Sequence, residues 1–339
     1  MKTFTCRCGG TLYFGNPVCV ACHSTLWLCD HCNQLAAVDP SPSENGDFIE
    51  ASCSVCQHPI RRCENQDHGV CLGSQVIQSD DLSESLCRYC RLNHTIPPLT
   101  QAGNLEKWRR LEAAKRRVLH DMTSQGLPLT DQDLPLSFAF LESTSEHVVS
   151  TGHSNGRITI NIAEADSIYR ESVRVQFGEP QRTLVGHFRH ELGHYYWQLI
   201  VRPRMIEAFR SSFGDERKPD YASAQETYYR DGPANQWSSR FVSAYASMHP
   251  WEDFAETFAM YFDIVAIIST ARDFSRVRVA ATLSQFDRMV KAFIEIGLVA
   301  NEMNRDLGLL DLVPEVFNDT VIEKLRFIDQ MTRLVSSRH

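Results

Sequence analysis

The sequence predicts an α+β protein in which a cysteine-rich, metal-stabilised domain precedes a helix-rich domain with a small sheet. Three observations predict this class. All 12 cysteines lie between Cys6 and Cys90. Beyond residue 100, apolar residues recur mainly at helical spacing, and only three short stretches follow the pattern of a strand. A Pro-Pro pair at 97–98 separates these parts, so we expect two domains, residues 1–96 and 97–339.

Composition and charge narrow the class of protein. Hydrophobic residues make up 43% of the 339-residue chain and charged residues 22%, which is ordinary for a globular protein. The formal net charge of -8 disfavours binding to nucleic acid or to an anionic membrane, because both need a basic surface. The chain opens without the pattern of a signal segment, and the apolar run 262–270 is too short to span a bilayer. We therefore expect a cytoplasmic protein with no nucleic-acid or membrane partner.

The cysteines fall into six close pairs, four of which have the spacing C-x-x-C. Two thiolates at that spacing can bind one tetrahedral zinc ion, and in a cytoplasmic protein such pairs favour metal over disulfides. Grouping in sequential order predicts three closed, structural zinc sites, which fold a segment poor in apolar residues. Their ligands are Cys6, Cys8, Cys19 and Cys22; Cys29, Cys32, Cys53 and Cys56; and Cys63, Cys71, Cys87 and Cys90. A cross-braced pairing stays open.

Four histidines lie close enough to these pairs to replace a cysteine. They are His23, His31, His58 and His68. Because twelve thiols already complete three sites, we expect these histidines at the surface. Up to residue 100 there are six Lys/Arg against ten Asp/Glu, so a phosphate-binding surface is disfavoured. A role in docking a protein partner or presenting a substrate is the better hypothesis.

The second domain is expected to begin with a helix from about Asn104 to Gly126. Three strand-like stretches follow, at 136–141, 146–151 and 157–162. The last alternates isoleucine with polar residues, which predicts a half-buried strand. It is either an ordinary sheet strand or an edge to which an extended peptide adds.

The next helix carries the stretch His190-Glu191-x-x-His194. Histidines four apart face the same side of a helix, so both imidazoles can reach one metal ion. Glu191 is placed to hold and deprotonate a metal-bound water. A core helix with two hydrogen-bonded histidines is the alternative, and a third ligand decides between the two.

The segment 248–259 supplies the candidates for the third ligand. Glu252 and Glu256 are four apart and share one face of a predicted helix. We assign Glu252 to the metal and expect Glu256 to accept the free N–H of a ligand histidine. Asp253 and His249 are rival ligands, and a solvated acidic face is the alternative to any metal role.

These residues resemble a known active site. His190-Glu191-x-x-His194 combined with Glu252 is similar to the motifs of gluzincin metallopeptidases. Tyr245, seven residues before Glu252, is similar to the tyrosine that stabilises the oxyanion in lethal-factor-type toxin peptidases.

Over nearly its full length, the chain also resembles a bacterial family of zinc-binding metallopeptidases with an N-terminal zinc ribbon. The resembling stretches are 151–153, 158–166, 178–197, 213–216 and 242–256. The resemblance implies a zincin-like domain that follows a zinc-ribbon domain in the sequence. The family's ribbon has fewer cysteines, so the second group of four looks like an inserted site.

Beyond residue 262 the chain is predicted to be helical, in segments near 284–307 and 318–336. They are expected to close the core, with five apolar side chains inward. These are Phe286, Phe293, Ile294, Leu298 and Met303.

The expected function is zinc-dependent hydrolysis of a peptide or protein amide bond. Zinc on His190, His194 and Glu252 would activate water, with Glu191 as general base and Tyr245 as oxyanion donor. The expected cofactors are one catalytic and three structural zinc ions. The alternative is an inactive zincin scaffold whose ribbons dock a protein partner. A ribbon protein that binds nucleic acid is disfavoured by charge.

Overall fold

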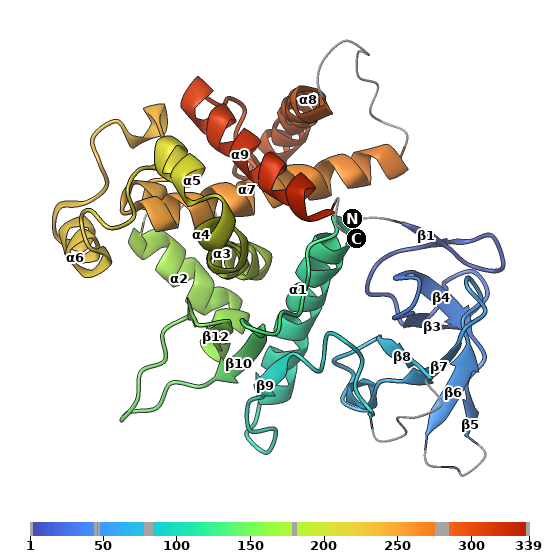
Figure 1. Ribbon diagram of the computed structural model, residues 1–339. Coiled ribbons are helices and arrows are strands. Elements are labelled where there is room, and N and C mark those ends of the chain that lie inside the picture. Colours follow the sequence, from blue (N-terminus) through green and yellow to red (C-terminus); the bar gives the residue numbers. More distant parts are fainter. Residues whose placement is uncertain are drawn as a thin grey trace. The chain divides into compact units, whose positions relative to one another are not determined.

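The computed structural model describes residues 3–43, 46, 48–77, 84–177, 182–274 and 285–336 (Figure 1). Contacts divide the chain into two compact units. The first consists of Met1–His120, Pro135–Gly152 and Arg157–Phe177, and the second of Asp121–Leu134, His153–Gly156 and Gly178–His339. The predicted α+β class is confirmed. The boundary near residue 97 stays a prediction, because the first unit groups the cysteine-rich part with elements that follow it.

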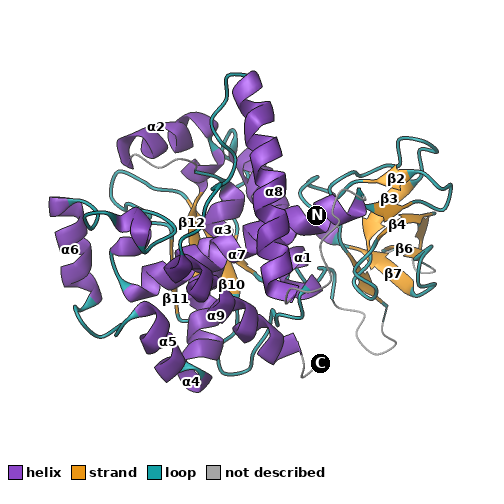
Figure 2. Cartoon of the chain, turned by 90° about the horizontal axis from the view of Figure 1, so that it is seen from above, coloured by secondary structure: helices purple, strands orange, loops and turns teal. Residues whose placement is uncertain are grey.

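Short antiparallel strands build the cysteine-rich part of the first unit (Figure 2). They are β1 (Phe4–Thr5) with β2 (Thr11–Leu12); β3 (Thr25–Leu28) with β4 (Leu35–Val38); and, in this order, β5 (Ser41–Pro42), β6 (Ile49–Ser52), β7 (Pro59–Arg62) and β8 (Ser74–Val76). A small apolar cluster around Trp27, Val38 and Ile60 includes the buried cysteines Cys29 and Cys53. Because this cluster has so few apolar side chains, we expect metal binding to stabilise this part of the fold.

A second small sheet has the strand order β11-β12-β10-β9. The strands are β9 (Asn93–Thr95), β10 (Ser137–Leu141), β11 (Gly152–Ser154) and β12 (Arg157–Asn161), and β10 runs parallel to both β9 and β12. Because β12 has a neighbour on each side, the hypothesis that it is an edge for an added peptide is wrong.

Residues 146–151, predicted as a strand, form an irregular connection instead. The Thr144 hydroxyl accepts the backbone N–H of His147 at 3.1 Å, and the Ser143 hydroxyl accepts that of Val149 at 3.0 Å. These local bonds satisfy backbone donors that a strand would use for pairing.

The other elements are helical. They are α1 (Asn104–Ser124), η1 (Glu64–Gln66), η2 (Ile162–Ala165), α2 (Ser167–Phe177), α3 (Leu184–Tyr196), η3 (Trp197–Val201), α4 (Arg202–Arg204), α5 (Ile206–Phe213), α6 (Tyr221–Asp231), η4 (Trp237–Ser239), η5 (Tyr245–Ser247), α7 (Pro250–Asp273), α8 (Gln285–Asp306) and α9 (Asp319–Ser336). The element η3 is a π-helical turn that continues α3. Phe286 and Phe293 of α8 are buried, as predicted.

Helices α3 and α7 pack closely in the second unit, and a glycine makes their contact possible. A Cβ atom at Gly193 would lie 2.9 Å from the Cα atom of Ala255, which is closer than side-chain carbons approach backbone. This contact brings the two helices that carry the site residues together.

Helix α7 is long and apolar enough, by length and composition, to cross a membrane. This differs from the expectation that the chain has no apolar run of that length. A buried core helix meets the same criteria, and α7 contacts α3, α5, α8 and α9 and buries the carboxylates of Glu252 and Asp253. We therefore interpret α7 as a core helix.

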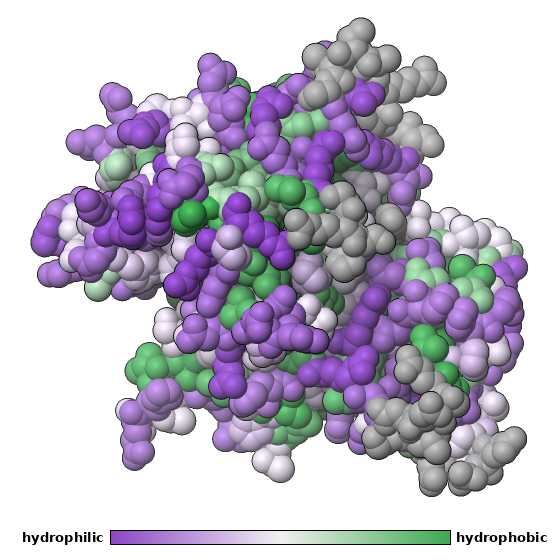
Figure 3. Space-filling model, in the orientation of Figure 1, coloured by the Kyte–Doolittle hydropathy of each residue, from purple (hydrophilic) through white to green (hydrophobic). Residues whose placement is uncertain are grey.

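Hydrophilic side chains predominate on the face drawn in Figure 3.

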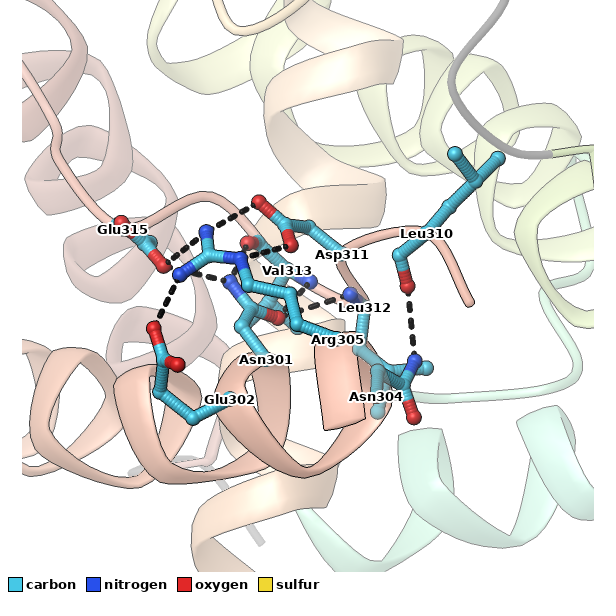
Figure 4. A network of polar contacts seen from close by, with 9 residues as sticks. All are labelled: Asn301, Glu302, Asn304, Arg305, Leu310, Asp311, Leu312, Val313 and Glu315. Atoms are coloured by element: carbon cyan, nitrogen blue, oxygen red, sulfur yellow. Dashed lines mark hydrogen bonds and ion pairs between the residues drawn. The ribbon is translucent and has the colours of Figure 1, made fainter. Parts of the chain in front are cut away.

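The segment between α8 and α9 is held against α8 by polar side chains (Figure 4). Arg305 forms ion pairs with Asp311 and Glu315, each at 2.7 Å. The buried Asn301 side chain accepts the N–H of Leu312 at 2.8 Å and donates to the carbonyl oxygen of Val313 at 2.9 Å. Side-chain bonds therefore order a segment that has no regular backbone pairing of its own.

The prediction that Leu298 and Met303 face inward is wrong, because both are exposed. The covered face of this half of α8 carries Gly297 and Asn301 instead. A Cβ atom at Gly297 would lie 2.7 Å from a methyl carbon of Val313, so the returning segment packs directly against that face.

Candidate active site

Helix α3 positions the two histidines of the predicted metal site. Thr183 caps the helix, and its hydroxyl accepts the N–H of Gly186 at 2.9 Å. His190 and His194 follow within the helix, one turn apart, and their Nε2 atoms lie 3.1 Å from each other. Two of the expected ligands are thus side by side.

Helix α7 adds the third group. The Oε2 atom of Glu252 lies 3.0 Å from His190 Nε2 and 3.4 Å from His194 Nε2. A tetrahedral zinc ion about 2.0–2.1 Å from each ligand separates them by about 3.3 Å. The Oε2 atom is buried and has no hydrogen-bond partner among the described residues. This set of three groups therefore fits a zinc ion.

The two rival ligands are engaged elsewhere. His249 caps α7, because its Nδ1 accepts the N–H of Trp251 at 3.1 Å, while its Nε2 lies 3.1 Å from the carbonyl oxygen of Glu216. Asp253 is buried and forms an ion pair with Lys324 at 2.6 Å. Neither belongs to the group formed by His190, His194 and Glu252.

Glu256 orients His190. Its Oε1 lies 2.6 Å from Nδ1 of His190, and its Oε2 accepts the hydroxyl of Ser243 at 2.7 Å. A carboxylate only accepts, so Nδ1 carries a proton, and Nε2 is the nitrogen that can bind a metal. Burial alone would raise the pKa of Glu256, but its bond to His190 holds the pKa below the ordinary value.

Tyr221, on α6, orients Glu252. Its hydroxyl donates to Oε1 of Glu252 at 2.9 Å, which leaves Oε2 facing the histidines. Sequence reasoning missed both Tyr221 and Ser243. No spacing rule connects Tyr221 to a residue 31 positions further along the chain, so its contact appears only in the folded protein.

Glu191 is buried beside the three ligand groups, and its Oε2 has no hydrogen-bond partner among the described residues. Burial raises the pKa of its carboxyl group, and His190 and His194 offset part of that rise. A carboxyl with a raised pKa is a stronger base once ionised. The structure thus leaves this group available for proton transfer.

Tyr245 lies on η5 with its ring centroid 6.0 Å from that of His190. Its ring meets Tyr228 edge-on at 5.6 Å. Burial and the Glu252 carboxylate raise the pKa of the Tyr245 hydroxyl well above its usual range. The hydroxyl therefore stays protonated and can act as a donor.

Aromatic side chains cover one side of the site. The Trp251 ring lies 4.0 Å from that of His194, and it also contacts the rings of Tyr221 at 5.7 Å and Trp197 at 6.1 Å. Packing of this kind limits the access of water and strengthens electrostatic interactions at the ligands.

The twelve cysteines form three groups of four in sequential order, with the four sulfurs of each group within 4.8 Å of one another. Within the groups, the sulfur–sulfur distances are 3.7 Å for Cys6–Cys22, Cys29–Cys56 and Cys71–Cys87, 3.8 Å for Cys8–Cys19 and 3.9 Å for Cys32–Cys53. Zinc–sulfur bonds of about 2.3 Å in a tetrahedron place sulfurs about 3.8 Å apart. Each group therefore fits a zinc ion, and the cross-braced pairing does not occur.

The third group of cysteines requires a glycine at position 73. A Cβ atom at Gly73 would lie 2.5 Å from the sulfur of Cys87. The N–H of Gly73 also points to the sulfur of Cys71 at 3.0 Å, as expected for a site that holds thiolates.

Three groups of cysteines are spaced for zinc, and a further centre combines two imidazoles with a carboxylate. Together they define a zinc-binding protein with a cysteine-rich N-terminal part. Residues 104–331 match the family described as "Putative zinc-binding metallo-peptidase", and residues 3–101 match a zinc-ribbon domain. The chain belongs to this metallopeptidase family. The predicted resemblance to zinc-binding metallopeptidases with an N-terminal zinc ribbon is thereby confirmed.

Relatives share nearly the whole chain. Uncharacterized proteins of Mycobacterium bovis and Mycobacterium tuberculosis are 35% identical over 342 residues, which covers 97% of this chain and 94% of each relative. The similarity therefore includes both the ribbon and the metallopeptidase region. No solved structure matches the chain.

Proposed function

We propose that this protein is a zinc-dependent peptidase that hydrolyses an amide bond of a peptide or protein. One observation carries the proposal: atoms of His190, His194 and Glu252 converge within 3.0–3.4 Å beside the buried carboxylate of Glu191. This arrangement supports a gluzincin-type catalytic centre. The thiolate groups support three further, structural zinc ions.

His190, His194 and Glu252 would hold the catalytic ion, and Glu256 and Tyr221 would keep two of these ligands in place. Zinc bound there supplies Lewis acidity, which lowers the pKa of water and polarises a carbonyl group. The remaining steps belong to side chains of this chain.

Glu191 is the proposed general base. It takes a proton from the attacking water as the water oxygen bonds to the carbonyl carbon, and it then passes that proton to the amine as the C–N bond breaks. Tyr245 would donate a hydrogen bond to the oxyanion that develops at the carbonyl oxygen. Its protonated hydroxyl supports this role.

The test compares wild type with Glu191→Gln. The variant should keep its zinc and fold, because glutamine has nearly the same shape, while hydrolysis falls on the order of 10²–10⁴-fold. Both proteins, loaded with zinc, are incubated with a denatured proteome, and new N-termini are identified by mass spectrometry. Equal cleavage by the variant would refute the role of Glu191.

The alternative is an inactive scaffold whose ribbon docks a partner. This alternative would be favoured if zinc-loaded wild type produced no new N-termini. A scaffold gives no reason to bury the Oε2 atom of Glu191 without a hydrogen-bond partner among the described residues. We further propose that the protein acts in the cytoplasm, and that its acidic ribbon contacts protein rather than nucleic acid or membrane.

A further inference from the structure

Two histidines meet on the surface of the ribbon, next to the second cysteine group. His31 lies between Cys29 and Cys32, and His58 follows Cys56 by two residues. Their rings stack with centroids 3.5 Å apart and an interplanar angle of 20°. His31 is exposed. Neither histidine contributes to the four-cysteine groups or to the proposed catalytic centre.

The same two side chains lie within reach of a thiolate. One ligand atom of His31, one of His58 and the sulfur of Cys56 are all within 4.8 Å of one another. Imidazole nitrogens and thiolate sulfur are the ligand types that zinc and cobalt prefer. His31 is the most exposed of the three residues, so its side chain is the least constrained by packing.

The proton on His58 is placed as in metal-binding histidines. Its Nδ1 lies 3.2 Å from the carbonyl oxygen of Cys56. A carbonyl oxygen only accepts, so Nδ1 carries the proton and Nε2 keeps the lone pair. A backbone carbonyl on the distal nitrogen is a common partner of a ligating imidazole.

Charge also favours a second cation. Four thiolates around one Zn²⁺ leave about two negative charges by valence counting. Cys56 is partly exposed, so part of this charge is accessible from outside. A thiolate sulfur has more than one lone pair, and it can therefore bridge two metal ions.

We infer that His31, His58 and Cys56 form a fourth metal site on the ribbon, which binds an exchangeable divalent ion such as Zn²⁺ or Co²⁺. Cys56 belongs to both groups, so its thiolate would be shared between this site and the second four-cysteine site. With three protein ligands, the site keeps an open coordination position on the surface. The site does not depend on the proposed peptidase activity.

The test uses the full chain carrying His190→Ala, so that the catalytic centre does not contribute. This protein is loaded with zinc, freed of excess zinc and dialysed against Co²⁺ alone. We expect one Co²⁺ bound per chain without loss of zinc, with the near-ultraviolet absorption of a thiolate–cobalt bond. His31→Ala combined with His58→Ala should abolish this binding.

The matched control replaces His23 and His68, two further histidines that lie close to the cysteine pairs in the sequence. His23 has a positive φ of 59°, so His23→Asn is combined with His68→Ala, because asparagine tolerates that conformation. The control should bind Co²⁺ as before. Zinc analysis of both variants verifies the thiolate sites.

Three results would overturn the inference. One is equal Co²⁺ binding by the two double variants. Another is bound Co²⁺ without thiolate absorption, which would exclude Cys56 as a ligand. The third is a loss of structural zinc in the His31/His58 variant but not in the control, since the histidines would then support the existing site and form no separate one.

Discussion

Tyr221 illustrates how a single hydroxyl can control a metal ligand. It donates to one oxygen of Glu252 and so determines which oxygen faces the histidines. Removing that bond in Tyr221→Phe leaves the carboxylate free to rotate. We expect the affinity of the catalytic site for zinc to fall about 10–100-fold, as is usual for partners of metal ligands.

Competition with a chromophoric chelator measures this change. Tyr229→Phe is the control, because Tyr229 lies on the same helix and is exposed. Equal zinc retention by Tyr221→Phe and the control would contradict the role of Tyr221.

His153 should make stability depend on pH. Burial lowers its pKa from the ordinary value of 6.5 to about 4, and its neighbour His194 adds to the effect. As pH falls from about 6.5 toward 4, the unfolded chain takes up a proton that the folded protein refuses, so stability decreases. His153→Gln should reduce this loss by roughly 1–3 kcal/mol.

Urea unfolding at pH 7 and pH 5, in buffer with the same free zinc, measures the difference between the two proteins. His147→Gln serves as the control, because His147 is exposed. If His153→Gln and wild type lost equal stability between these pH values, His153 would not be the group responsible.

At the scale of residues, spacing in the sequence predicted the parts of the site that are local. His190, Glu191 and His194 occupy one helical turn, so their positions follow from helix geometry alone. Glu252 required a search for a second helix, and the structure brings it to the histidines. Tyr221 and Ser243 could not be predicted, because their contacts depend on tertiary packing.

At the scale of elements, the contact between α3 and α7 limits the distance between the ligands. Gly193→Ala would place a Cβ atom 2.9 Å from the Cα atom of Ala255, and backbone cannot move aside as a side chain does. We expect a loss of about 1–3 kcal/mol in the free energy of unfolding, the usual effect of overpacking. Zinc affinity should fall as well, because the helices separate.

The control is Gly186→Ala, in the same helix. There the nearest atom to a new Cβ is the hydroxyl of Thr183, at 3.1 Å, which belongs to a side chain. Chemical denaturation and zinc competition compare the variants. Unchanged values for Gly193→Ala would show that the helices do not depend on this contact.

Sequence patterns predicted helices better than strands. The apolar stripes of α1 and α8 continue over several turns, so local periodicity was informative for most of their length. The stretch 146–151 was too short for its pattern to outweigh side-chain bonds to the backbone. Leu298 and Met303 were wrongly predicted to be buried, because the segment after α8 covers a different face of that helix.

At the scale of the whole molecule, the two parts of the chain are stabilised differently. The second unit buries many aromatic and aliphatic side chains, among them Phe209, Phe254 and Phe258. The cysteine-rich part has short strands around the small cluster that contains Trp27 and Ile60. Burial can hold the helices, whereas we expect the ribbon to depend on metal ions.

Removal of zinc should therefore unfold the ribbon selectively. After a strong chelator has stripped the thiolate groups, we expect hydrogen exchange to become fast in β3, β4, β6 and β7, while α7 and α9 stay protected. Mass spectrometry of deuterated peptides measures both regions in one sample, and metal analysis verifies that zinc has been removed. The reason is that these strands bury too few apolar side chains to compensate for their conformational entropy. Slow exchange in the zinc-free strands would instead show that the cluster around Trp27 suffices to fold them.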